Sequence, residues 1–280
     1  MENKSPKELN VEAKIDDLVH KMVVHQSSDD DLLLRLWQRI RTDAEIQTIQ
    51  DYANIVSITR LGLNDHGPVH MKIVCCNALK MLYILHDAGI QTSLEKEGIG
   101  TITDSACAVM IAALLHDSGM TIGRSSHELH SGIIGYSLIN GLLEKLLSDD
   151  KENMRRTAIR SLAMEGIIGH MGTYPVHSIE AGLIQIADGC DMTKGRARIP
   201  LGIPTKPTEG DIHKYSANAI EKVRICQGNE CPLKIEIEMT SEVGLFQVEE
   251  VLLPKIQFCP AKHLVELYAN IKNEEVKRYI

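Results

Sequence analysis

The stretch Thr103–Gly119, TDSACAVMIAALLHDSG, decides the fold because its apolar run ends on an ionisable pair. A threonine or an aspartate can cap a helix at the start of this stretch, and the glycine can end it. The apolar residues lead directly into His116 and Asp117. A histidine and a carboxylate at the edge of a core are costly to bury unless they bind a metal ion or a charge. The stretch therefore predicts a core helix that ends at a metal site.

The composition favours a soluble helical protein. The chain has 280 residues, enough for one large domain or for a main domain and a smaller one. Hydrophobic residues make up 44% and aromatic residues only 4%, so the core consists mostly of aliphatic side chains. Seven cysteines, an odd number that lies mostly in apolar runs, are typical of reduced buried thiols.

The negative net charge and the short apolar runs argue against nucleic-acid and membrane partners. A net charge of −8 argues against a nucleic-acid surface and against binding to anionic membranes. No apolar run approaches the roughly 18 residues that a membrane span needs. The amino-terminal residues contain no apolar signal core. We therefore expect a cytoplasmic protein without nucleic-acid or membrane partners, and the sequence leaves open a homo-oligomer.

Apolar spacing divides the chain into a helical part and a mixed part. It predicts helices over residues 11–25, 30–52, 68–86, 103–117, 125–147, 150–170 and 178–191. No strand is expected before residue 230, and residues 195–212, with three prolines and three glycines, are typical of a surface excursion.

The carboxy-terminal pattern is different. After a short helix near 212–223, the alternation at 233–239 predicts a strand, 244–253 a second strand and 260–277 a closing helix. We therefore predict a mainly α fold with two domains. A helical domain covers residues 1–200, with a helical lead-in over 1–60, and a small α+β appendage covers 205–280.

Further candidate ligands lie on other predicted helices. His66 precedes Pro68, which suits the first turn of a helix, and His70 lies inside that helix. His116 and Asp117 differ by about 100° around their helix, so both can reach one ion only at the helix end. Because a carboxylate has two oxygens, Asp117 can also bridge two ions.

Two aspartates share one face of a later predicted helix. Asp188 follows apolar residues and is expected to be the deeper of the two. Asp191, three residues on, is expected near the surface, where it orients Asp188 or meets an arginine.

The chemistry of these groups points to a divalent metal ion. Nitrogen and oxygen ligands suit manganese, iron, cobalt, nickel or zinc, and we expect one or two ions per chain. A bound divalent ion lowers the pKa of its water from 15.7 to about 7 and neutralises a phosphate oxygen. Hydrolysis of a phosphate ester needs both effects, so the set favours phosphorylated substrates.

The ordered set of His70, the pair His116-Asp117 and Asp188 resembles the HD-domain metal-dependent phosphohydrolase superfamily. The resemblance covers roughly residues 60 to 200, about half the chain. It implies an all-helical HD-domain bundle in which these four residues bind the primary metal.

The resemblance also implies roles for other histidines. His127, in the sequence His-Glu-Leu-His-Ser, and His170 match the additional histidines of members that hold two metals. His130 lies three residues from His127 on the same side of the predicted helix and is the alternative ligand. His66 stands four residues before the first ligand, as does the proton-donating histidine of the cyclic-nucleotide phosphodiesterases in this superfamily. This likeness implies that His66 protonates the leaving oxygen.

A basic segment follows the last predicted ligand helix. Lys194, Arg196 and Arg198 concentrate positive charge on an acidic protein. The segment has two interpretations, a solvated loop and a phosphate clamp beside the metals.

The leading hypothesis is a metal-dependent phosphohydrolase acting on a nucleotide or another small phosphate ester. A metal-activated hydroxide near Asp117 would attack phosphorus, and His66 would protonate the leaving group. One alternative is a metal- or nucleotide-binding regulator with little turnover, whose strand at 233–239 forms a dimer edge. A second alternative is a deoxynucleoside triphosphate triphosphohydrolase, which the same site can support.

Overall fold

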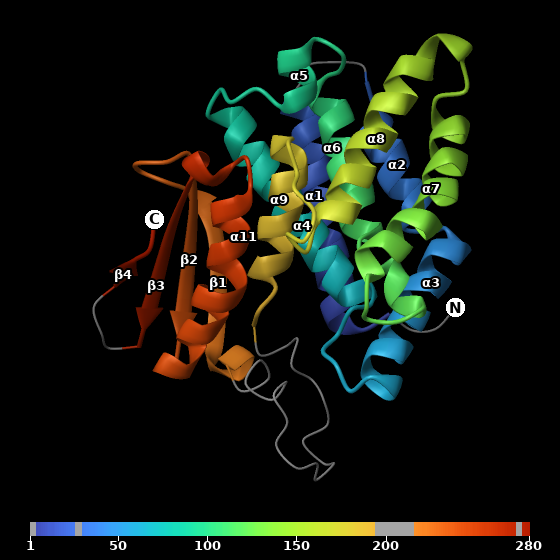
Figure 1. Ribbon diagram of the computed structural model, residues 1–280. Helices are drawn as coiled ribbons and strands as arrows, with labels where there is room; N and C mark the ends of the chain where they lie inside the picture. The colour runs from blue at the N-terminus through green and yellow to red at the C-terminus, as the bar shows by residue number, and fades with distance from the viewer. Residues whose placement is uncertain (1–3, 26–29, 194–215, 273–275) are drawn as a thin grey trace.

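The computed structural model describes residues 4–25, 30–193, 216–272 and 276–280, and it is mainly helical with a small carboxy-terminal sheet (Figure 1). The helices of the first part are α1 Pro6–His25, α2 Leu32–Ile40, α3 Ala44–Ile55, α4 Pro68–Asp87, α5 Ser93–Glu97, α6 Ile102–Leu115, α7 His127–Leu146, α8 Asn153–Gly169 and α9 Ile179–Cys190. The prediction of a helical part with a mixed appendage is confirmed at this level. The division into two domains at residues 200 and 205 stays a prediction.

Helix α6 is the centre of the helical part. All of its residues are buried, and it packs against α4, α8 and α9. A capping box between Thr101 and Asp104 starts the helix, two residues before the predicted start. Arg155 of α8 pairs with the buried carboxylate of Asp104 at 2.5 Å. A helix with no solvent face is held by its neighbours on every side, so its end has a fixed place in the protein.

The helix predicted over residues 30–52 is two helices, α2 and α3. A turn at residues 41–43 separates them, and Asp43 caps α3 by accepting hydrogen bonds from the backbone N–H groups of Glu45 and Ile46. The short helix α5, capped by Thr92, was not predicted. Ser125 and Glu128 do not form the expected box, because α7 begins after Ser126, whose side chain makes no capping hydrogen bond.

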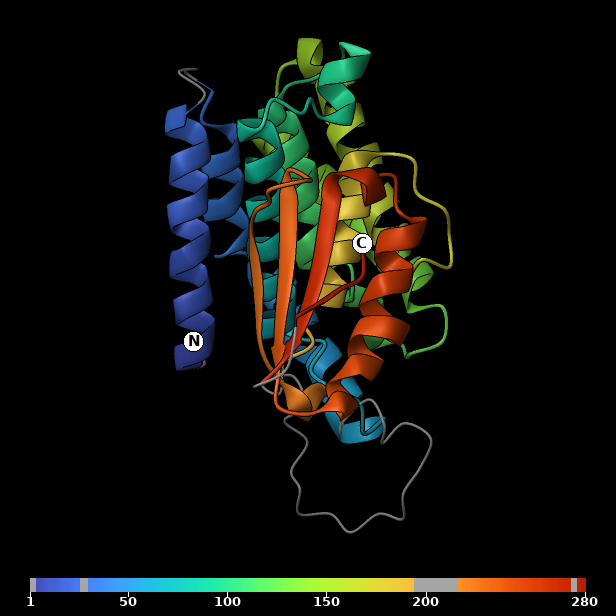
Figure 2. The ribbon, with the colours of Figure 1, turned by 90° about the vertical axis from the view of Figure 1, so that its left-hand side faces the viewer.

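The carboxy-terminal part contains four strands, β1 Ile220–Gln227, β2 Leu233–Met239, β3 Val265–Ile271 and β4 Lys277–Arg278, in that order across the sheet. β1 and β2 are antiparallel, β2 and β3 are parallel, and β3 and β4 are antiparallel. Figure 2 shows this sheet in front of the helical part. The sheet packs on α4, and the buried residues of the sheet and the helices form one hydrophobic cluster.

Three predictions for this part are wrong. β1 begins at Ile220, inside the end of the segment predicted as a short helix and before residue 230, whereas residues 216–219 are helical as predicted. The segment predicted as a second strand is helical, with the π-turns of Gln247–Leu252 followed by α11 Leu253–Phe258. The predicted closing helix contains β3 instead.

The spacing of the buried residues explains why the predicted second strand is a helix and why the predicted closing helix contains a strand. Val248, Leu252 and Ile256 are buried at a spacing of four residues, which is the helical period. In β3 the buried apolar residues Val265, Leu267 and Ala269 follow at a spacing of two, which is the strand period, although Glu266 between them is buried as well. The parallel connection between β2 and β3 needs a long crossover, and α11 lies within it.

The predicted strand β2 is confirmed, but it lies inside the sheet. Its neighbours β1 and β3 pair with it on both sides from Leu233 to Met239. A strand that is paired on both sides offers no free edge to a second copy. The feature that motivated the regulatory alternative is therefore absent from β2.

Helix α4 bears on the expectation that no apolar segment is long enough to span a membrane. By length and composition alone, α4 could cross a membrane, and it is the one helix among the described residues of which this is true. However, 56% of its most apolar window is buried inside the protein. Buried apolar helices of this kind are typical of the core of a soluble protein.

Candidate metal centre

Five helix ends bring the predicted ligands together. The residues are His70 in the first turn of α4, His116 and Asp117 directly after α6, His127 at the start of α7, His170 directly after α8 and Asp188 near the end of α9. All six side chains are buried. Because helix ends rather than helix faces meet here, residues that are adjacent in sequence, such as His116 and Asp117, can face the same centre.

A glycine lets the end of α6 pack against α7. Gly119 follows the pair in a 3-10 turn, and its backbone N–H donates to the hydroxyl of Ser131 at 2.8 Å. A Cβ atom at this position would lie 2.0 Å from the carbonyl oxygen of His127 and 2.6 Å from the backbone nitrogen of Ser131. Glycine is therefore required for Asp117 and His127 to come this close.

The first group of ligand atoms surrounds His70. Its Nε2 lies 3.2 Å from Nε2 of His116, 3.3 Å from Oδ2 of Asp117 and 3.2 Å from Oδ1 of Asp188. Atoms that bind one ion at about 2.1 Å lie roughly 3.0 to 3.4 Å apart in octahedral or tetrahedral geometry. These four atoms therefore have the spacing of one metal's ligands.

The second group of ligand atoms lies on the other side of Asp117. Its Oδ1 is 3.2 Å from Nε2 of His127 and 3.6 Å from Nε2 of His170. The two imidazole nitrogens are 3.1 Å apart. One carboxylate thus presents Oδ2 to the first group and Oδ1 to the second.

Each of the four histidines is oriented by a hydrogen bond at its other nitrogen. His116, His127 and His170 place Nδ1 next to a backbone carbonyl at 2.9, 3.1 and 2.7 Å. His70 places Nδ1 2.7 Å from Oδ2 of Asp191. Nδ1–H donates in each contact, so in the neutral ring the lone pair lies on Nε2, the nitrogen directed at the centre.

Asp191 differs from its prediction. It is buried, not near the surface, and it orients His70, not Asp188. The reason is its position after α9, where it faces the start of α4.

The electrostatics of the centre suit a metal ion. Burial lowers the pKa of His170 to about 4, although the nearby Asp117 carboxylate opposes this effect. Its imidazole is therefore neutral at neutral pH, the state that binds metals. Burial alone would raise the pKa of Asp117, but the charges of His116 and His66 and the surrounding hydrogen bonds hold that pKa well below its ordinary value. The carboxylate is therefore ionised.

Two cations at the centre were missed from the sequence. Lys255, on α11, donates to Oδ2 of Asp188 and, at 3.1 Å, to the backbone carbonyl oxygen of His170. Arg124 is exposed, and its guanidinium lies 3.4 Å from Nε2 of His127. Lys255 lies two residues beyond the segment 244–253 that was wrongly predicted as a strand, so no helix that carries it toward the centre was predicted. The helical spacing of its buried neighbours was the signal that pointed to its position.

The other predicted site residues have different places. The ring of His66 is buried, 5.9 Å from the ring of His70, and its Nδ1 lies 2.6 Å from the carbonyl oxygen of Asn64. His130 makes none of the contacts that define the two groups of ligand atoms, and its Nδ1 is buried without a hydrogen-bond partner among the described residues. Lys194, Arg196 and Arg198 lie outside the described residues.

Comparison with known proteins finds a relative of similar length. The chain is 38% identical over 240 residues to the uncharacterized protein MJ1020 of Methanocaldococcus jannaschii. The match covers 86% of this chain and 90% of the relative. No protein-family model and no solved structure matches the sequence.

Proposed function

Because the chain belongs to the family of the uncharacterized protein MJ1020, whose name states no activity, we propose its function from its own buried centre. We propose that it is an HD-domain phosphohydrolase that uses divalent metal ions to hydrolyse a nucleotide or another small phosphate ester.

The position of Asp117 carries this proposal. The carboxylate is fully surrounded by protein, and its Oδ2 has no hydrogen-bond partner among the described residues. An unsatisfied buried polar atom costs about 1–3 kcal/mol, and more when it is charged. A cation between Oδ2 and the Nε2 atoms of His70 and His116 would remove that cost. The residues present therefore fit a metal ion.

The donor set favours a catalytic site over a structural one. The two groups of ligand atoms contain histidine and aspartate and no cysteine, whereas structural zinc sites usually contain several cysteines. His70, His116, Asp117 and Asp188 would hold one ion, and Asp117, His127 and His170 a second. When bound, such ions supply a water of lowered pKa and neutralise charge on a phosphate oxygen.

The remaining groups would bind substrate and move a proton. Arg124 lies exposed beside His127, where its guanidinium can contact a phosphate oxygen. If Nδ1–H of His66 donates to the carbonyl oxygen of Asn64, its Nε2 is the atom that can carry a proton to the leaving oxygen. The charge on Lys255 holds Asp188 with Oδ1 turned toward His70.

The test compares Asp117→Ala with the native protein. Both are loaded with manganese or iron, analysed for metal content and assayed against a panel of phosphate esters. We expect the substitution to remove bound metal and hydrolysis together, with activity reduced by at least roughly a hundredfold. Full activity in the variant would contradict the proposal. Metal binding without turnover in the native protein would instead support a regulator.

A matched pair of variants tests the second group of ligands. His127→Ala removes an Nε2 atom that faces Asp117, whereas His130→Ala removes a histidine of the same helix outside both groups. We expect metal content to fall in the first variant and to stay unchanged in the second. The opposite pattern would assign His130 as the ligand. Product analysis with deoxynucleoside triphosphates then separates the two hydrolytic reactions, since a triphosphohydrolase releases intact triphosphate.

A further inference from the structure

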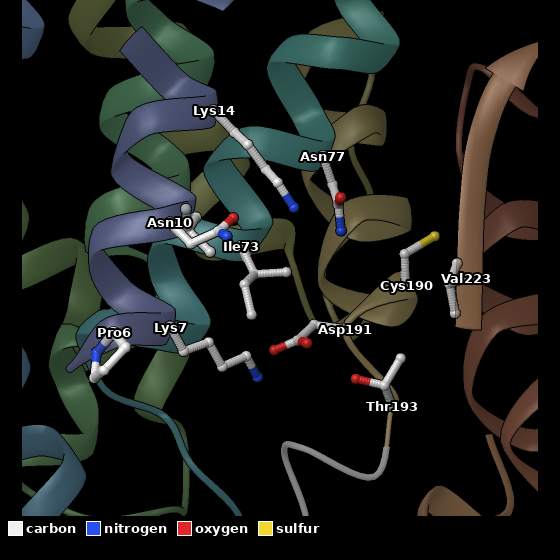
Figure 3. A pocket seen from close by; sticks show the side chains of 11 residues that line it. Pro6, Lys7, Asn10, Lys14, Ile73, Asn77, Cys190, Asp191, Thr193 and Val223 are labelled. Carbon is white, nitrogen blue, oxygen red and sulfur yellow. The ribbon is translucent and has the colours of Figure 1, made fainter. Parts of the chain in front are cut away.

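A pocket beside the metal centre is not used by the proposed reaction. It has a volume of about 530 Å³ and lies between α1, α4, the end of α9 and β1 (Figure 3). Small-molecule sites usually have volumes of roughly 300–1,000 Å³. None of the six predicted metal ligands lines the pocket, but Asp191, the hydrogen-bond partner of His70, does. The pocket is therefore distinct from the centre and adjacent to it.

One wall of the pocket is cationic. Lys7, Asn10 and Lys14 line it from α1, and their spacing of three and four residues places them on one face of that helix. Neither lysine forms an ion pair with a carboxylate in the part of the chain that the structure describes. Lys7 is half-buried and Lys14 exposed, so both ammonium groups are accessible to a ligand from solvent. This wall suits an anion with two negative charges.

The opposite wall offers hydrogen-bond acceptors. Asp191 and Thr193 line the pocket after α9, and Asn77 lines it from α4. Figure 3 shows the ends of Lys7, Lys14 and Asn77 and the carboxylate of Asp191 directed into the shared space. A ligand here meets ammonium groups at one end and a carboxylate with a hydroxyl at the other.

We infer that this pocket binds a phosphorylated small molecule, with its phosphate between Lys7 and Lys14 and its hydroxyl or amino groups toward Asp191 and Thr193. The two ammonium groups match a phosphate dianion in charge. The Asp191 carboxylate repels a second anionic end, so the other end of the ligand carries hydrogen-bond donors.

The occupant of this pocket is coupled to the metal centre. A donor group that binds Asp191 draws on the carboxylate that accepts from Nδ1–H of His70, whose Nε2 faces the ligand atoms of the centre. Changing the hydrogen bond behind a metal-binding histidine changes its affinity for the metal. By linkage, the metal changes the affinity for the pocket's ligand by the same factor.

Calorimetric titration of the full-length, metal-free protein tests the binding. The probe is a phosphonate analogue of ribose 5-phosphate, which has no phosphate ester to hydrolyse, and ribose is the comparison. We expect the phosphonate to bind more tightly than ribose. The double variant Lys7→Gln, Lys14→Gln should weaken its binding at least about tenfold.

The control has the same change of net charge. Lys21→Gln with Lys80→Gln removes two exposed lysines of α1 and α4 that do not line the pocket. Circular dichroism confirms that each variant is folded. Equal losses in the two double variants, or binding no tighter than that of ribose, would overturn the inference. Thr193→Val should weaken the binding of the phosphonate and of ribose alike.

The coupling has its own measurement. Manganese affinity is determined with and without the saturating phosphonate, in the native protein and in the Lys7→Gln, Lys14→Gln variant. We expect a several-fold change in the native protein and none in the variant. An unchanged affinity in the native protein would contradict the role of Asp191. Because the binding titration uses metal-free protein, its failure is distinguishable from a failure of the proposed hydrolase activity.

Discussion

At the scale of single residues, the centre depends on which nitrogen each histidine turns inward. Backbone carbonyls hold Nδ1 of three of the four histidines, and Asp191 holds the fourth. A fixed tautomer saves the entropy of orienting each ring when a metal binds. The cost appears in the metal-free protein, where the neutral imidazole of His170 and the ionised carboxylate of Asp117 are buried together.

That cost predicts the pH dependence of metal-free protein. The pKa of His170 is about 4 in the folded chain and 6.5 in the unfolded chain. The unfolded state therefore binds more protons between these values, and stability falls as the pH drops from about 6.5 toward 4. We expect His170 to contribute a loss of about 2 kcal/mol between pH 7 and pH 5. Urea unfolding in chelator measures the loss, and His170→Gln should remove it. An unchanged pH dependence in the variant would refute this assignment.

At the scale of elements, a buried ion cluster fixes α1 to the helix that carries His70. Lys72 of α4 donates to Glu8 and Glu12 of α1, at 2.5 Å each. Lys4 also pairs with Glu12 at 2.6 Å. The cluster lies two residues beyond His70, so α1 helps to set where that ligand sits and where the wall of the phosphate pocket stands.

Lys72→Met should destabilise the protein by about 3 kcal/mol. The change leaves Glu8 without its cation, while Lys4 still pairs with Glu12, so the loss lies at the low end for breaking a buried pair. The urea midpoint at neutral pH measures it. The control is Arg224→Gln, which breaks an exposed pair with Glu238 on the neighbouring strand and should change the midpoint little. Equal effects would show that the cluster behaves as a surface ion pair.

At the scale of the whole molecule, the carboxy-terminal part reaches the centre that the helical part builds. Lys255 of α11 binds both Asp188 and the backbone after α8, and α11 packs on α9. Cys259 and Pro260 pack on Gly182 of α9, where a Cβ atom would lie 3.3 Å from each. Two distant stretches of the chain therefore share one site.

Metal binding should therefore protect α11 from hydrogen exchange. The ion would hold Asp188 and His170, the two residues that Lys255 contacts, so opening α11 would break contacts with more rigid partners. A charge-assisted hydrogen bond contributes about 1.5–3 kcal/mol, so we expect exchange in Leu253–Phe258 to slow roughly tenfold with manganese. Mass spectrometry of the exchanged peptides measures this. Lys255→Met should abolish the protection and the exposed control Lys262→Met should keep it. Protection that persists without Lys255 would contradict the coupling.

The sequence by itself determined the helical part and the order of the candidate ligands. Both depend on short-range patterns, namely the apolar period of α6, the proline that opens α4 and the ionisable pair after Leu115. These patterns are local because a helix closes its hydrogen bonds within four residues. The resemblance through His70, the His116-Asp117 pair and Asp188 used the same local signals, and these residues meet in space.

Only the tertiary structure decided the rest. The apolar runs at 244–253 and 260–277 suit either period, and the pairing of β2 with β3, which joins Leu233 to Val265, resolved them. The roles of Asp191, Arg124 and Lys255 were also undecided. Each role depends on a contact with a residue of another segment. The sequence gives the chemical type of a side chain but not which distant residue the fold places beside it.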